Sequence, residues 1–264
     1  MIDASRCLFS RVSLAGRLFG KGEIARAGNR PHIGRLRILL REPLEAIVLT
    51  LKKESDLLGN SLAPHVDLSF QVIGEVLPAD HGYALYAALT HRKEELHSLQ
   101  GLSIQTIAGI PDKKGKIYLS DRSRLWIRLP YDQIPMIYDL AGKSLTIGAH
   151  GIRLGIPQIY SLRPTTQLKS RIVVIKGYQE PTAFIEAVSR QLEILEIKAR
   201  AVIPFSTQGE IERKTIKIKR FTVVGFTLVI FDLSEEDSIK LQIHGLGGKR
   251  RMGCGVFVPV GSNL

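Results

Sequence analysis

Alternating apolar and polar residues predict a regular order of strands and helices from residue 66 onward. Val66–Ile73 alternates as a half-buried strand does, and a helix is expected from His81 to about Leu96. Asp80 stands where the N-cap residue of that helix belongs. The other elements expected in this first half are strands at 102–107, 115–119 and 124–129, a short helix at 131–140 and closing strands within 144–159.

The same order returns in the second half. A strand of Ile and Val is expected at 171–176, followed by a helix that Pro181 opens and that runs to about Glu196. Ser234 with Asp237 resembles a capping box before another short helix. Further strands are expected at 199–204, 213–220, 223–231 and 255–258. The pattern predicts an α+β fold of two tandem ferredoxin-like (RRM-like, βαββαβ) domains.

Residues 1–63 do not follow this pattern. The first forty residues are rich in Arg and poor in acidic residues, with little sustained periodicity. Two interpretations stay open, a transit peptide and a poorly ordered basic extension. A short helix is expected at about 44–58. The predicted organisation is an extension at 1–63, a first ferredoxin-like domain at 64–165 and a second at 166–264.

Charge and cysteine content narrow the function classes. Lys and Arg total 37 against 25 Asp and Glu, a formal net charge of +12, which attracts polyanions such as nucleic acids. Acidic membranes attract the same charge, but no apolar run approaches the roughly 18 residues that span a bilayer. Cys7 and Cys254 form neither a disulfide framework nor a zinc motif. We expect a cytoplasmic protein without a metal or another cofactor.

A glycine-rich segment near the end carries the clearest chemical signal. Five glycines fall in the eleven residues from Gly245 to Gly255, around the cations Lys249–Arg251. Backbone amides beside a cationic cluster suit a phosphate chain, and a flexible basic hairpin is the alternative. Arg250 occupies the position where a Walker loop needs Ser or Thr, and also one where the dinucleotide fingerprint needs Gly. The segment therefore favours a nucleic-acid backbone over a nucleotide cofactor.

The spacing glycine–apolar–glycine, five residues, glycine–any–glycine resembles the C-terminal loop of the repeat-associated mysterious protein (RAMP) superfamily. Two longer strings, His244–Pro259 and Leu77–Tyr86, are similar to one branch, the CRISPR repeat-processing endoribonucleases (the Cas six family) associated with type I systems. The resemblance covers about Val66 to Pro259. It implies that the loop binds RNA through Gly245, Gly247, Gly248, Lys249, Arg250, Arg251 and Gly253.

The resemblance also implies an activity, namely metal-independent cleavage of CRISPR repeats in precursor transcripts. The ribose 2′-hydroxyl attacks the adjacent phosphate and leaves a 2′,3′-cyclic phosphate and a 5′-hydroxyl. This reaction needs a group that takes the 2′ proton, one that protonates the leaving oxygen, and positive charge near the phosphate. The implied partners are CRISPR precursor RNA, its repeat-derived product and other proteins of a CRISPR effector complex.

Placement within the family pattern selects the catalytic candidates. The family's catalytic histidine lies in or just after the first helix of the N-terminal domain, which implies His97 at the predicted helix end. His81, at the helix start, is the second candidate, with a structural role as its alternative. Tyr86 is a candidate for orienting the histidine or donating a proton, with core packing as its alternative.

Further cations are candidates for an RNA path. Arg122, Arg124 and Arg128 surround Trp126, and Arg beside an aromatic ring can hold single-stranded bases by stacking. Alternation places Arg124, Trp126 and Arg128 on one strand face, although a partly buried Trp is the alternative. A second cationic run, 213–220, has the pattern of a sheet with one charged face or of a solvated edge strand.

Two other functions compete with the endoribonuclease. The first is a non-catalytic RAMP subunit that holds guide RNA in an effector complex. His97 favours the enzyme, since a protein that only binds RNA has no need of a histidine there. The second is a host-type RNA-recognition protein, which the sequence disfavours because its strands lack the aromatic signature of that domain.

Overall fold

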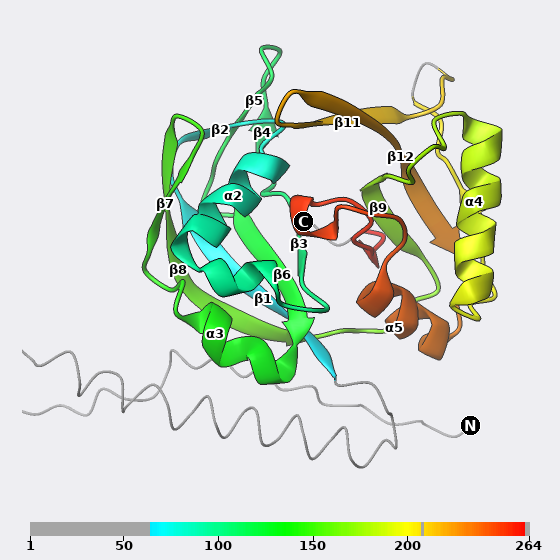
Figure 1. Ribbon diagram of the computed structural model, residues 1–264, viewed down its shortest axis with the longest axis horizontal. Coiled ribbons are helices and arrows are strands. Elements are labelled where there is room, and N and C mark those ends of the chain that lie inside the picture. Colours follow the sequence, from blue (N-terminus) through cyan, green and yellow to red (C-terminus); the bar gives the residue numbers. More distant parts are fainter. Residues whose placement is uncertain (1–63, 207–208, 262–264) are drawn as a thin grey trace, which may run out of the picture. The chain divides into compact units, whose positions relative to one another are not determined.

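The computed structural model describes residues 64–206 and 209–261 (Figure 1). The extension expected at 1–63 and its helix at 44–58 lie outside the described residues. The predicted α+β fold is confirmed, because each half of the described chain has one antiparallel sheet with two helical segments between its strands. A separate three-stranded sheet accompanies the first half, in the order β2 (Val76–Pro78), β5 (Lys116–Tyr118) and β4 (Ile110–Pro111).

The sheet of the first half has the strand order β3-β6-β1-β8-β7, in which the first four strands are those of a ferredoxin-like domain. Alternation along the central strand buries Val66, Leu68, Phe70 and Val72, and β1 pairs antiparallel with both β6 and β8. The strands of this half are β1 (His65–Ile73), β2 (Val76–Pro78), β3 (Ser103–Ile104), β4 (Ile110–Pro111), β5 (Lys116–Tyr118), β6 (Arg124–Pro130), β7 (Ser144–Ile147) and β8 (His150–Ser161).

Two helical segments cover one face of this sheet (Figure 1). The first consists of α2 (Gly82–Arg92) and the 3-10 helix η1 (Glu94–His97), and the second of η2 (Tyr131–Gln133) and α3 (Ile134–Tyr138). Leu85 and Leu89 of α2 are buried in the same core as the inward side chains of β1. The helix predicted at 81–96 is therefore two helices, because Lys93 adopts an extended backbone between them.

The second half repeats the arrangement with the strand order β10-β12-β9-β13, while β11 pairs with β12 beside this path. Its elements are β9 (Leu168–Val173), α4 (Pro181–Ile194), β10 (Arg200–Val202), β11 (Arg213–Ile218), β12 (Phe221–Phe231), α5 (Glu235–His244), the 3-10 helix η3 (Arg250–Met252) and β13 (Val258–Pro259). Two sequence signals are confirmed, since Pro181 begins α4 and the Ser234 hydroxyl accepts a hydrogen bond of 3.1 Å from the Asp237 amide. We propose a domain boundary near residue 165, between β8 and β9.

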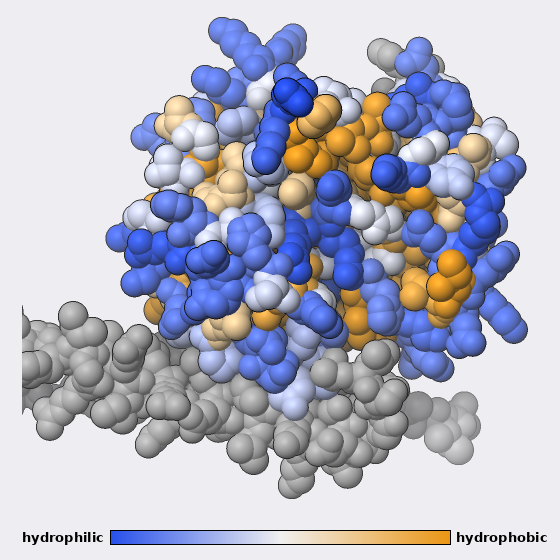
Figure 2. Space-filling model, in the orientation of Figure 1, coloured by the Kyte–Doolittle hydropathy of each residue, from blue (hydrophilic) through white to orange (hydrophobic). Residues whose placement is uncertain are grey.

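The hairpin of β11 and β12 extends from the second half toward α2 (Figure 1). The carboxylate of Asp80 accepts a hydrogen bond of 2.6 Å from the backbone amide of Lys217 in β11. The prediction of Asp80 as the N-cap was wrong, because the residue at that position is His81, which makes no side-chain cap. Ile218 and Val223 of this hairpin pack on a small buried cluster. Figure 2 shows apolar surface near the top of the molecule on this face.

Arg128 joins the two halves through a fully buried guanidinium. It forms two hydrogen bonds of 2.8 Å with the carboxylate of Asp67, its neighbour across β1 and β6. Its Nη1 also donates at 2.8 Å to the backbone carbonyls of Gln242 and Phe257 in the second half. The expectation that Arg128 contacts RNA is therefore wrong, because the second half covers this end of β6 and buries the side chain.

Candidate active site

Tyr86 and His97 form a hydrogen-bonded pair on the surface of the first half. The hydroxyl of Tyr86 lies 3.0 Å from Nδ1 of His97, and the rings meet edge to face with centroids 5.6 Å apart. Tyr86 is buried, whereas His97 is exposed. Within the described ranges no group bonds Nε2 of His97. The free ring nitrogen is thus the atom available to a substrate.

The local fold explains how these residues meet. Helix α2 ends when the amide of Lys93 bonds the carbonyl of Leu89 at 2.9 Å and the chain becomes extended. The single turn of η1 then buries Leu96 and leaves His97 on the outside. The histidine thereby turns back onto Tyr86, eleven residues earlier.

Arg251 of the glycine-rich segment reaches this pair from the second half. Its Nη1 and Nη2 donate hydrogen bonds of 2.6 Å to the backbone carbonyls of His97 and Leu99. The same Nη1 lies 3.5 Å from the hydroxyl of Tyr86. A planar guanidinium is suited to bonding two acceptors at once. The three side chains therefore place a proton-transferring group, a hydroxyl and a fixed positive charge together.

Most glycines of the segment serve its own packing. Gly245 and Gly247 have φ of +61° and +70°, which favour glycine. A Cβ atom would collide with the carbonyl of Gly255 at the first position and with that of Val174 at the second. Gly248 differs, since a Cβ atom there meets open space. The family resemblance implies that a ligand approaches these glycines closely. Gly248 leaves space for such a ligand, whereas the protein's own backbone occupies the space beside Gly245 and Gly247.

The cations of the segment differ in their surroundings. Lys249 is exposed, with a left-handed backbone. Arg250 donates from Nη1 to the carbonyls of Ile243 and His244, at 3.0 and 2.6 Å, and so caps the end of α5. Arg251 is half-buried beside His97. Lys249 is therefore the most accessible of the three cations, Arg251 lies at the candidate catalytic pair, and Gly253 is buried against Thr106.

The predicted aromatic and arginine face on β6 is partly present. Trp126 is half-buried and its ring lies 5.3 Å from that of Tyr160 on β8. Arg124 is half-buried and bonds the carbonyls of Asp121 and Ser123, at 2.6 and 2.9 Å, while Arg122 is exposed. Trp126 and Tyr160 thus lie side by side on this face, and the exposed Arg122 precedes β6 in the sequence.

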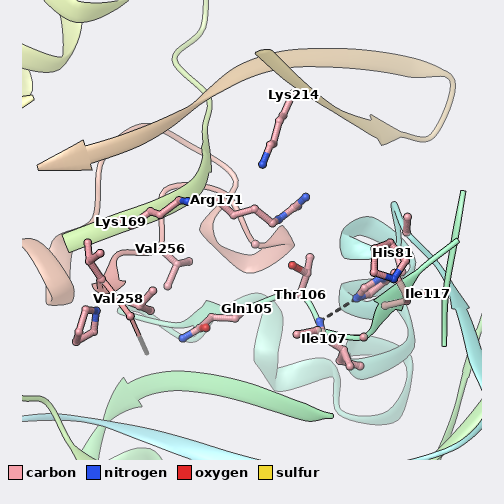
Figure 3. Close-up of a pocket in the computed structure, with 18 residues that line it drawn as sticks. His81, Gln105, Thr106, Ile107, Ile117, Lys169, Arg171, Lys214, Val256 and Val258 are labelled. Carbon is pink, nitrogen blue, oxygen red and sulfur yellow. Dashed lines mark hydrogen bonds between the residues drawn. The ribbon is translucent and has the colours of Figure 1, made fainter. Parts of the chain in front are cut away.

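His81, the second catalytic candidate, is fully buried and uses both ring nitrogens within the fold. Nδ1 lies 2.8 Å from the carbonyl of Pro78, and Nε2 accepts a hydrogen bond of 2.9 Å from the amide of Ile107 (Figure 3). Burial lowers the pKa of His81 below the ordinary 6.5, which keeps the ring neutral. These contacts support the structural alternative for His81.

In the described part of the chain, no three His, Cys, Asp or Glu side chains gather as metal ligands would. Among these described residues, no helix is both long and apolar enough to cross a membrane. The acidic cluster at the start of α5 lies in that helix's first turn, where the helix dipole favours negative charge.

Comparisons with known proteins agree on one family. The model of the Cas6 family, described as Cas6 Crispr, matches residues 66–262. The CRISPR-associated endonuclease Cas6 of Myxococcus xanthus (strain DK1622) is 34% identical over 203 residues, which are 77% of this chain and 84% of that protein. The match therefore extends over most of both chains.

Solved structures support the fold. A CRISPR-associated protein Cas6 aligns with a TM-score of 0.52 at 13% identity and covers 75% of this chain and 99% of its own. A RAMP protein that binds different RNA substrates aligns with a TM-score of 0.51 at 15% identity, covering 74% and 98%. The tandem ferredoxin-like prediction is thus confirmed, while the association with type I systems stays a prediction. The family match and the Myxococcus relative together show that this chain belongs to the Cas6 family of CRISPR-associated endonucleases.

Proposed function

We propose that this protein cuts CRISPR repeat RNA in precursor transcripts without a metal ion, and that His97 is its catalytic residue. The observation that carries the proposal is the arrangement of Tyr86, His97 and Arg251. An exposed imidazole with one bonded nitrogen and one free nitrogen lies beside a guanidinium from the glycine-rich segment. General acid–base catalysis of phosphate transfer needs a proton carrier and a positive charge so placed.

The reaction would proceed by transesterification within the RNA. The 2′-hydroxyl gives up its proton, its oxygen forms a bond to the adjacent phosphorus as the bond to the 5′-oxygen breaks, and the leaving oxygen takes up a proton. When Nδ1 of His97 accepts from the hydroxyl of Tyr86, Nε2 carries a hydrogen that it can donate to the leaving oxygen. With the opposite tautomer, Nε2 can accept the 2′ proton instead.

Arg251 and Tyr86 have distinct roles in this proposal. Arg251 supplies charge that stabilises the pentacovalent phosphorane as negative charge develops on its oxygens. Tyr86 is a positioning residue, because its hydroxyl holds the ring of His97 in one orientation. A fixed orientation matters since small displacements of a reacting group can cost about 100-fold in rate.

Charge, a relative and the chemistry of cleavage each point to RNA as the substrate. The formal net charge of +12 favours a polyanion, and the Myxococcus relative is a CRISPR-associated endonuclease. Cleavage by 2′-hydroxyl attack would also select RNA over DNA. We propose, further, that the cleaved repeat product stays bound and passes to other proteins of a CRISPR effector complex.

The test uses the full chain and the repeat RNA from its own genome. One reaction contains excess chelator, and a second contains RNA with a 2′-deoxyribose at the cleavage position. We expect cutting in the first reaction and none in the second. The product should carry a 5′-hydroxyl, which a polynucleotide kinase labels without prior phosphatase treatment. A requirement for magnesium, or cutting of the deoxy substrate, would contradict the mechanism.

A non-catalytic RAMP subunit that holds guide RNA is the second candidate function. The exposed face with Trp126 and Tyr160 would suit such a protein as well. A non-catalytic subunit should bind repeat RNA tightly and cleave it under none of these conditions. The free nitrogen of His97 beside Arg251 favours the enzyme.

A further inference from the structure

A cavity of about 670 Å³ lies between the two halves of the described chain. Its volume falls in the range of roughly 300–1,000 Å³ that is usual for small-molecule sites. Figure 3 shows Lys169 and Arg171 projecting from β9, Lys214 pointing toward them from β11, and Gln105 and Thr106 on the opposite side. Cations of the second half therefore face polar groups of the first.

The three cations are incompletely neutralised. Among the described residues, no carboxylate lies within 4.0 Å of Lys169 or Arg171, whereas Lys214 has Glu212 at 3.8 Å. Burial lowers the pKa of Lys214, and the charges of Arg171 and Lys169 lower it further against the opposing effect of Glu212. A bound anion would relieve the repulsion among these cations.

Gln105 presents an unsatisfied donor at the other side of the cavity. Its side-chain Nε2 is buried and has no hydrogen-bond partner in the part of the chain that the structure describes. A buried donor without a partner costs about 1–3 kcal/mol, so such groups are uncommon in folded proteins. An acceptor on a ligand in this cavity would satisfy it.

The walls and the position of the cavity indicate the kind of ligand. Ile107, Val256 and Val258 supply apolar surface on which a planar base can lie. Gly253 also lines the cavity, two residues after Arg251, whose guanidinium bonds the carbonyl of His97. The lining of the cavity therefore includes a residue two positions from the arginine of the candidate active site.

We infer that this cavity takes one unpaired nucleotide of the RNA substrate, with its phosphate near Lys169, Arg171 and Lys214 and an acceptor of its base at Gln105. The inference rests on the proposed function and names a specificity site for it. Gln105 would act as a selector, because a base that presents an acceptor satisfies the buried amide and one that presents a donor leaves it unpaired. No sequence motif marks the site, although Lys169 and Arg171 alternate with apolar or small residues along one strand.

The first experiment measures affinity for the repeat RNA and its salt dependence. The double variant Lys169→Ala/Arg171→Ala should bind at least about tenfold more weakly and show a salt slope shallower by about one or two. The matched control Lys143→Ala/Lys198→Ala removes the same charge from exposed positions outside the cavity. It should change affinity less than threefold. Equal losses in both double variants would show a general charge effect and would overturn the inference.

The second experiment couples Gln105 to a single base. Repeat RNAs that carry one abasic nucleotide at each position in turn are bound to the wild-type protein and to Gln105→Leu, which retains side-chain size but lacks the amide. One position should cost about tenfold in the wild type and less than twofold in Gln105→Leu, since the variant has already lost the contact. If no position shows this coupling while the repeat RNA is still cleaved, the inference is wrong and the proposed function stands.

A third arm separates an RNA nucleotide from a free one. Nucleoside 5′-monophosphates are titrated into the protein with and without bound repeat RNA. We expect the RNA to exclude the free nucleotide from the cavity. Tight binding of the monophosphate that persists beside bound RNA would identify a separate small-molecule site and contradict the inference. Failure of the protein to bind repeat RNA at all would overturn both this inference and the proposed function.

Discussion

The guanidinium of Arg251 donates a hydrogen bond of 2.6 Å to the backbone carbonyl of His97, 154 residues earlier in the chain. This bond, with its counterpart to Leu99, fastens the glycine-rich segment of the second half to the turn that carries the candidate catalytic histidine. The position of His97 thus depends on both halves. A substitution in the segment can alter catalysis without contact with the RNA.

Replacement of His97 by Ala should lower the cleavage rate about 10²- to 10⁴-fold, the usual contribution of a general acid or base. Binding of repeat RNA should change little, because the imidazole is proposed to move protons rather than hold the backbone. Single-turnover cleavage assays and filter binding measure the two effects. His91→Ala is the matched control, an exposed histidine on the preceding helix. Wild-type cleavage by His97→Ala would exclude this residue.

Tyr86→Phe should retain the edge-to-face ring contact while removing the hydroxyl that bonds Nδ1 of His97. We expect the single-turnover rate to fall roughly tenfold to a hundredfold, because the imidazole loses its fixed orientation. The dissociation constant for the RNA should stay within twofold. A rate equal to that of the wild type would assign Tyr86 to core packing alone.

The neighbouring glycines Gly247 and Gly248 should respond differently to substitution by Ala. Gly247→Ala forces a side chain into the left-handed backbone region and against the carbonyl of Val174. The strain alone should cost about 1–3 kcal/mol of unfolding free energy. Gly248→Ala meets open space and should change that free energy by less than about 0.5 kcal/mol. Urea denaturation measures both, and equal stability of the two variants would contradict the packing role of Gly247.

Arg128→Met should destabilise the protein, whereas Arg124→Met on the same strand should not. The first change leaves the carboxylate of Asp67 largely buried without its partner, together with two carbonyls of the second half. Removal of one member of a buried ion pair costs about 3–5 kcal/mol. Arg124 is half-buried, and its side chain bonds the nearby carbonyls of Asp121 and Ser123. Thermal unfolding followed by circular dichroism compares them, and a stable Arg128→Met protein would show that the pair is dispensable.

The neutral, buried state of His81 should make stability depend on pH. Burial lowers the pKa of His81 in the folded protein below 6.5, its ordinary value and the value expected in the unfolded chain. As pH falls, His81 therefore binds a proton in the unfolded chain before it does so in the folded protein. The stability that the neutral ring contributes is complete above about pH 6.5 and is lost as pH falls through the folded-state pKa. Urea denaturation measures the free energy of unfolding at about pH 5 and pH 7.5. The difference between the two pH values should be smaller for His81→Asn than for His91→Ala. An unchanged difference would contradict this assignment.

Local signals were sufficient for much of the fold. The alternation of Val66–Ile73, the proline that opens α4 and the capping serine of α5 each act within a few residues, and the structure confirms all three. The prediction at Asp80 failed because its carboxylate bonds an amide in β11, 137 residues away. Arg128 was placed on the correct strand, but the second half buries it.

By itself, the sequence determined the order of strands and helices, the excess of positive charge and the glycine-rich segment. These properties depend on side-chain periodicity and composition, which neighbouring residues set. Only the tertiary structure decided that His97 bonds Tyr86 while His81 is buried, which arginine lies beside His97 and which cations line a cavity with Gln105. The pairing of Tyr86 with His97 depends on the extended backbone at Lys93. The arginine and the cavity depend on contacts between the two halves, and no spacing within either half encodes how their surfaces meet.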